Sequence, residues 1–263
     1  MNEEALAHPP HWKKNLGERA DLELSFRELY GYSHFFTDAL RARIRYYQMR
    51  YDESWDLLDR AAHGADQAPS DVPNLIRRFF VSVFSFYTAL AERPLSSEGE
   101  LPNLQMPAVP PEVFDTYPEL RQVIIAREAA EALLRLHAGQ PGEAVAIFRD
   151  HIATDGGTVK GNSAYNYVGL AAGLQALGNT DDALRNLENA GYVIRITGPT
   201  LTQARVAALL NGFYHYLDEG KTAQEWLEFL YSLPCPTATK ELFEQRAARV
   251  LERCTTRGRL LPL

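Results

Sequence analysis

The sequence predicts an all-α protein built from antiparallel helix hairpins, and three observations support this prediction. Apolar residues recur at helical spacing along most of the chain, alternating β-type patterns are rare, and short glycine-containing turns separate the helical segments of the second half. With 263 residues, 46% of them hydrophobic, the chain is long enough to bury a sizeable core. We therefore expect a single all-α domain over residues 1–263.

The first third of the chain predicts a less regular helical bundle over residues 20–93. We expect helices at Leu24–Gln48, Asp52–Ala62 and Val72–Ala91. The third of these helices is apolar around most of its circumference, so it must be covered on several faces.

A proline-rich, acidic connecting segment follows at residues 94–118. It contains six of the 15 prolines and four acidic residues but no basic residue, a composition that opposes regular helix. Two interpretations stay open: the segment lies on the surface as an insertion, or it covers a groove of the helical body.

The second half predicts a regular series of helix hairpins. A capping helix at residues 237–257 completes the series, and its arginines Arg246, Arg249 and Arg253 lie beside an apolar face. The expected helices are Glu119–Ala138, Gly142–Ala153, Asn162–Leu177, Asp181–Ile196, Thr200–Asp218, Ala223–Leu233 and Thr239–Arg257.

Three turn glycines, Gly139, Gly178 and Gly220, align with one another together with the residues that follow them. Gly220 is followed by Thr222 and Glu225, which have capping-box spacing. Five residues after the glycines stand Ala144, Ala183 and Glu225, and nine residues after them stand Phe148, Leu187 and Phe229. The central unit has small and large residues in a characteristic order: Tyr167, Leu170, Ala171, Leu174, Gly178, Ala183, Leu187 and Ala190.

This pattern resembles the tetratricopeptide repeat over residues 119–233. The glycines are 39 and 42 residues apart, longer than the roughly 34 of that repeat, so we expect extended helices or turns. An earlier unit over Ala39–Ala61 has Met49 at the glycine position, Ser54 at the small position and Leu58 at the large position. The resemblance implies a right-handed superhelix of stacked hairpins that acts as a scaffold or adaptor for another protein.

In that family the first helix of each hairpin lines a concave surface that binds a partner peptide or helix. One interpretation is that this surface accepts an apolar peptide or amphipathic helix, with Asn211 bonding the peptide backbone and Tyr214 acting as an anchor. The other is that a segment of the same chain fills the groove. The residues expected to face the ligand are Ala126, Ala130, Leu133, Val168, Ala172, Ala207, Asn211 and Tyr214.

A basic patch is expected at Arg41, Arg43, Arg45 and Arg50. Its ordinary interpretation is a solvated helix face whose arginines pair with nearby carboxylates, and its alternative is a surface for an acidic partner. The net charge of −7 opposes nucleic-acid binding, although an RNA-binding helical repeat remains the alternative class.

The sequence contains no recognisable catalytic motif, so we expect a protein that is not an enzyme and needs no cofactor or metal. The glycine-rich residues 155–163 lack the order of a phosphate-binding loop, and Asp150 and His151 are neighbours that point in different directions on a helix. An enzyme or ligand-binding regulator whose site is assembled from distant helices stays open. The cysteine usage favours a cytoplasmic protein, no segment is expected to span a membrane, and association between copies of the chain is left open.

Overall fold

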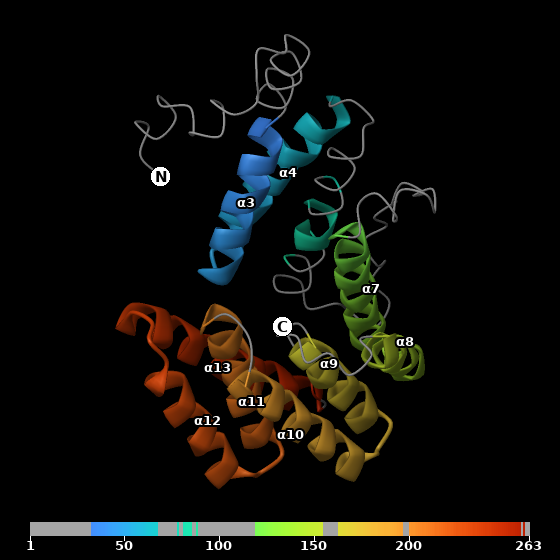
Figure 1. Cartoon of the computed structure of the whole chain (residues 1–263), viewed down its shortest axis with the longest axis vertical. Coiled ribbons are helices and arrows are strands. Elements are labelled where there is room, and N and C mark those ends of the chain that lie inside the picture. The colour runs from blue at the N-terminus through green and yellow to red at the C-terminus, as the bar shows by residue number, and fades with distance from the viewer. Residues whose placement is uncertain are drawn as a thin grey trace, which may run out of the picture.

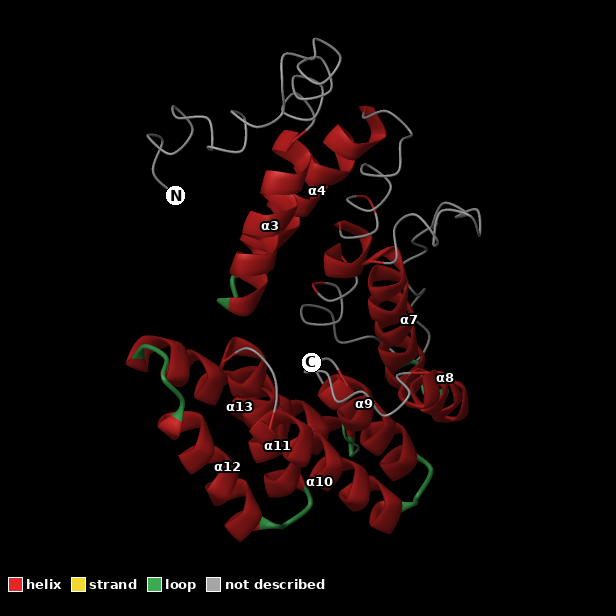
Figure 2. Ribbon diagram, viewed as in Figure 1, coloured by secondary structure: helices red, strands yellow, loops and turns green. Residues whose placement is uncertain are grey.

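The computed structural model describes residues 33–67, 78, 81–85, 88, 119–154, 163–196, 200–258 and 260. Every regular element in these ranges is an α-helix, and none is a strand (Figure 2). The all-α prediction is therefore confirmed for this part of the chain. The proline-rich segment 94–118, most of Val72–Ala91 and the start of Leu24–Gln48 lie outside the described residues.

The helices follow one another as hairpins (Figure 1). In chain order they are α3 (Ser33–Tyr47), α4 (Tyr51–Gln67), α7 (Glu119–His137), α8 (Pro141–Thr154), α9 (Ser163–Ala176), α10 (Thr180–Ile196), α11 (Thr200–Tyr216), α12 (Gly220–Ser232) and α13 (Thr237–Arg257). The helix predicted from Ala223 begins three residues earlier, at Gly220. Glu219 is its N-cap residue and no side chain caps it, so the predicted capping box of Thr222 and Glu225 was wrong.

The helices from α7 onward pack in a regular order. Each helix contacts the next one, and α7 contacts α9, α9 contacts α11, and α11 contacts α13. Their buried side chains form one hydrophobic cluster, which also contains Leu260 beyond the end of α13. Helices α3 and α4 pack against each other around a second cluster that includes Val81 and Phe84.

Four hairpins share one turn geometry. Met49, Gly139, Gly178 and Asp218 each have a positive φ, of 58°, 82°, 79° and 63°. After each of them, the next amide donates to the carbonyl five residues back, with N···O distances from 2.8 to 2.9 Å. We call these four the turn residues. The alignment on Gly220 was therefore wrong by two residues, because Asp218 holds the left-handed conformation there, which aspartate tolerates better than most side chains.

The turn residues define equivalent positions in each hairpin. Five residues after the turn the side chain is small and fully buried. These residues are Ser54, Ala144, Ala183 and Ala223. Ala223, and not Glu225, is thus the small residue of the last hairpin. The expected unit around Met49 has the same turn as the others, and Ser54 and Leu58, assigned to its small and large positions, are buried.

A second small position lies seven residues before each turn residue. Ala42, Ala132 and Ala171 occupy it in three hairpins and are fully buried, while Asn211 occupies it in the fourth. In the first hairpin Ser54 Oγ donates to the Ala42 carbonyl over 3.0 Å, and in the last Asn211 Nδ2 donates to the Ala223 carbonyl over 2.7 Å. The two small positions therefore face each other where the paired helices cross, and in two hairpins a hydrogen bond joins them.

Candidate functional site

The residues expected to face a ligand lie in the core. Six of them are between 0 and 7% exposed and Leu133 is 9% exposed, while the Ala126 side chain lies outside the described residues. The side chains of Ala130, Leu133, Val168, Ala172, Ala207, Asn211 and Tyr214 all belong to the buried set. These seven side chains are thus not exposed at the surface of the protein.

Asn211 and Tyr214 have partners inside the protein. The Asn211 amide is used in the hairpin hydrogen bond to Ala223. Burial, followed by the nearby carboxylates of Glu188 and Glu219, raises the pKa of Tyr214 to about 12, while the positive charge of Arg195 acts in the opposite direction. Glu188 and Arg195 lie on α10, so the Tyr214 hydroxyl lies near the second helix of the preceding hairpin. Neither side chain is placed to bind a peptide as expected.

The corrected turn position changes the residues that are equivalent between hairpins. Tyr165 on α9 and Arg205 on α11 both lie thirteen residues before their turn residues, and the Arg205 guanidinium carbon is 4.8 Å from the Tyr165 ring centroid. Gln175 and His215 share a second position, three residues before the turn. Tyr165, Gln175 and Arg205 are partly exposed and His215 is exposed. We call these four residues the repeat face. Sequence reasoning missed Arg205 because the Gly220 alignment shifted the last unit by two residues and put Ala207 at its position. It missed His215 because the position three residues before the turn was not expected to face a ligand in any unit.

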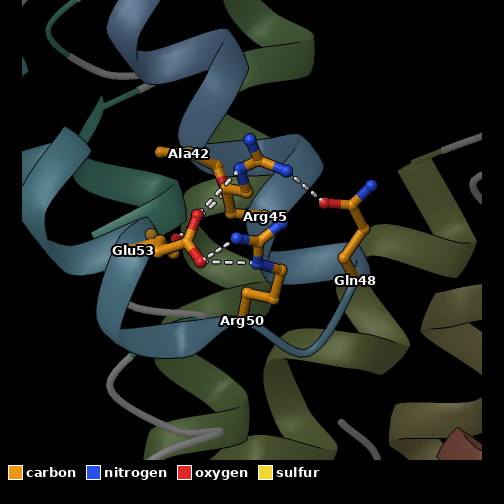
Figure 3. A network of polar contacts seen from close by, with 6 residues as sticks. Ala42, Arg45, Gln48, Arg50 and Glu53 are labelled. Carbon is orange, nitrogen blue, oxygen red and sulfur yellow. Dashed lines mark hydrogen bonds and ion pairs between the residues drawn. The ribbon is translucent and has the colours of Figure 1, made fainter.

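The predicted basic patch is matched by acidic partners in the same hairpin. Arg41 lies 3.7 Å from Asp38, and both Arg45 and Arg50 pair with Glu53, as Figure 3 shows for the last two. Arg45 also donates to Gln48 over 2.8 Å, and the Arg43 guanidinium carbon lies 5.3 Å from the centroid of the Phe84 ring. Residues 33–67 contain five arginines and six carboxylates. Three of the four arginines thus pair with carboxylates, as in the ordinary interpretation.

One of these ion pairs recurs in the next described hairpin. Arg45 and Glu53 lie four residues before and four residues after Met49, and Arg135 and Glu143 have the same relation to Gly139. Arg135 joins Glu143 on α8 and also Glu131 on its own helix, the latter at 2.9 Å.

The candidate catalytic and metal-binding groups are dispersed in the described ranges. His151 is buried, and its Nε2 lies 3.0 Å from Glu128 Oε2, while its neighbour Asp150 is exposed. Asp155 lies outside the described residues. Within the ranges that the structure describes, no three histidine, cysteine or acidic side chains are grouped so that they could hold a metal ion. None of the helices described is both long and apolar enough to cross a membrane.

Comparisons with known protein families, with curated proteins and with solved structures find no match to this chain. The class that the described residues define is an all-α protein with four hairpins of one turn geometry.

Proposed function

We propose that the chain is a non-catalytic scaffold or adaptor that binds a peptide or helix of a partner protein, and that its hairpins form a superhelix like that of tetratricopeptide repeats. The shared turn geometry supports this proposal, as do the contacts of α9 with α7 and α11 in addition to those with its hairpin partner. In the family that the sequence resembles, the first helices of successive hairpins line the binding surface. Here these helices are α7, α9 and α11.

The partner would contact the repeat face and not the buried residues first expected. The observation that carries this proposal is the stacked pair of Tyr165 and Arg205, which occupies one repeat position on two adjacent first helices and is partly exposed. Tyrosine and arginine are enriched among the residues that dominate binding energy at protein interfaces.

The alternative functions have less support. RNA binding would require a basic surface, whereas Arg41, Arg45 and Arg50 each pair with a carboxylate. An enzyme with a site assembled from distant helices would use titratable groups that converge. Reproducible turnover in a broad substrate screen, lost on Asp150→Asn or His151→Gln, would favour that alternative.

The test is to isolate the partner from the native source with the tagged full-length chain and to measure its affinity for variants. Arg205→Ala and His215→Ala should each weaken binding by about tenfold, the loss of roughly 1.4 kcal/mol. Tyr192→Ala is the matched control, because Tyr192 is 64% exposed on α10 and lies outside the repeat face. A partner that binds both repeat-face variants with unchanged affinity, or that is lost only with Tyr192→Ala, would contradict the proposed surface.

A further inference from the structure

The second helices of the four hairpins differ in their outer surfaces. On α4 and α8 every exposed side chain that the structure describes is charged, polar or small. On α12 one large apolar side chain is exposed, that of Tyr231, whose hydroxyl donates to Glu244. On α10 two are exposed, Tyr192 at 64% and Ile196 at 51%, and they lie one helical turn apart. Among the described side chains of these four helices, only those of α10 thus form a pair of neighbouring large apolar groups open to solvent.

These two side chains belong to a larger exposed side of α10. The opposite side of the helix packs on α9 and α11, and Gly191 lies so close to the Trp226 ring of α12 that a Cβ there would come within 2.4 Å of it. The outward side carries two arginines, an acidic residue, an amide and the two apolar residues. We call these six exposed residues the α10 face: Arg185, Glu188, Asn189, Tyr192, Arg195 and Ile196.

The α10 face is complementary to a second copy of itself in the antiparallel orientation. Around a two-fold axis each pair of facing residues occurs twice, once in each direction. An axis that passes between Glu188 and Asn189 sets these two residues opposite each other, so that the Asn189 amide can donate to the Glu188 carboxylate of the second copy. The same axis sets Arg185 opposite Tyr192, a guanidinium opposite an aromatic ring. Arg185 and Tyr192 are seven residues apart, so both lie along nearly one line of the helix, at the centre of the face.

The ends of the face are complementary as well. The same axis sets Asp182 opposite Arg195 of the second copy, and Ile196 opposite the first turn of that helix. Within one chain Asp182 pairs with Arg185 at 2.8 Å, and the Arg195 guanidinium carbon lies 4.7 Å from the centroid of the Trp226 ring. An exposed ion pair between Asp182 and Arg195 adds little to the affinity, but it favours this register over others.

Other positions of the axis fit less well. An axis at Arg185 would set the two Arg185 side chains against each other, and like charges repel. An axis at Tyr192 would set Glu188 opposite Ile196 and would leave Arg185 beyond the end of the other helix. The charges of the face therefore select the axis between Glu188 and Asn189.

We propose that α10 is the contact helix of a symmetric homodimer, in which the α10 faces of two copies pack antiparallel around this axis. One helix from each copy makes a contact smaller than the roughly 1,200 Å² of a standard interface, so we expect reversible association with a dissociation constant on the order of 10 μM. The α10 face shares no residue with the repeat face. The dimer therefore forms whether or not a partner is bound at the repeat face, and failure of either proposal leaves the other intact.

Sedimentation equilibrium of the full-length protein, from about 1 to about 300 μM, measures this association. Tyr192→Ala and Arg185→Ala should each raise the dissociation constant about tenfold, because each removes the central contact on both sides of the axis. The double variant should raise it only slightly more than either single variant, well below the roughly hundredfold of additive effects, because the two residues contact each other across the axis. Leu177→Ala and Arg149→Ala are the matched controls and should leave association unchanged, because Leu177 is 54% exposed and Arg149 is exposed on α8, both outside α10.

A wild-type protein that stays monomeric throughout the concentration range would overturn the proposal. So would a dimer that Tyr192→Ala and Arg185→Ala leave unchanged, or one that Leu177→Ala or Arg149→Ala weakens equally, since the contact would then lie elsewhere. A mass that grows beyond two chains would contradict a closed two-fold contact, because head-to-tail association does not end at the dimer. Fully additive effects in the double variant would show that Arg185 and Tyr192 do not meet across the axis.

Discussion

Two kinds of hairpin crossing are found side by side in this protein. In the hairpins α7–α8 and α9–α10 the two facing small positions are both alanine, at Ala132 with Ala144 and at Ala171 with Ala183. In α3–α4 and α11–α12 one of the two residues is polar and donates to the carbonyl of the other. The polar residue lies on the second helix in one case and on the first helix in the other. The crossing therefore needs side chains of small volume, and a polar side chain is accepted there when it has a buried hydrogen-bond partner.

The largest effect is expected where an alanine crossing is enlarged. Ala183→Leu adds three carbon atoms at a position with no exposed surface, between α10 and α9, so it should lower the free energy of unfolding by about 3 kcal/mol. Urea denaturation of the full-length protein measures this change. Ala146→Leu on α8, where the side chain is exposed, is the control and should change stability by under about 0.5 kcal/mol. Similar losses in both variants would contradict the close crossing.

Substitutions at the two polar crossings should lower the free energy of unfolding by less than Ala183→Leu does. Asn211→Ala removes a buried hydrogen bond and several atoms, so the free energy of unfolding should fall by about 2 kcal/mol. Ser54→Ala is nearly isosteric and removes only the hydroxyl, so the free energy of unfolding should fall by about 1 kcal/mol. Asn186→Ala serves as the control, because the Asn186 amide bonds only within its own helix, to the Asp182 carbonyl. A stability of Asn211→Ala equal to that of the wild type would show that volume alone decides the crossing.

The smallest effect at neutral pH, but a distinct one in alkali, is expected from Tyr214 in the polar hairpin α11–α12. Its folded-state pKa of about 12 is above the ordinary tyrosine pKa of 10.0, so its contribution to stability is present below pH 10 and is lost as the pH rises toward 12. Urea denaturation at pH 9 and at pH 11 should show a smaller alkaline loss for Tyr214→Phe than for the wild type. An equal loss in the two proteins would mean that Tyr214 does not carry this dependence.

Local spacing accounts for what the sequence could predict. Helical periodicity located the helices from Glu119 onward to within a few residues, and the pairing of Arg41 with Asp38 follows from a separation of one helical turn. The turn at Met49 was also found from the small and large residues that follow it. These features depend on residues that are close together in the chain.

Other features could not be read from local spacing. Glycine is the usual left-handed residue, so Gly220 was the natural choice for the last turn, but the end of α11 places Asp218 in that conformation. The burial of Val168 and Ala172 depends on how helices stack after they form. The contact of Tyr46 with Arg246 joins residues 200 positions apart, and no pattern within either segment indicates it.

The equivalence of the four turns is most directly tested by comparing Gly178→Ala with Gly220→Ala in urea denaturation. Gly178 has a φ of +79°, so a methyl group there is strained and the free energy of unfolding should fall by about 1 kcal/mol. Gly220 is the first residue of α12, has no positive φ and has open space around its Cα, so alanine there should leave stability unchanged or raise it slightly. A loss in Gly220→Ala as large as that in Gly178→Ala would contradict the shared turn geometry and restore Gly220 as the turn residue.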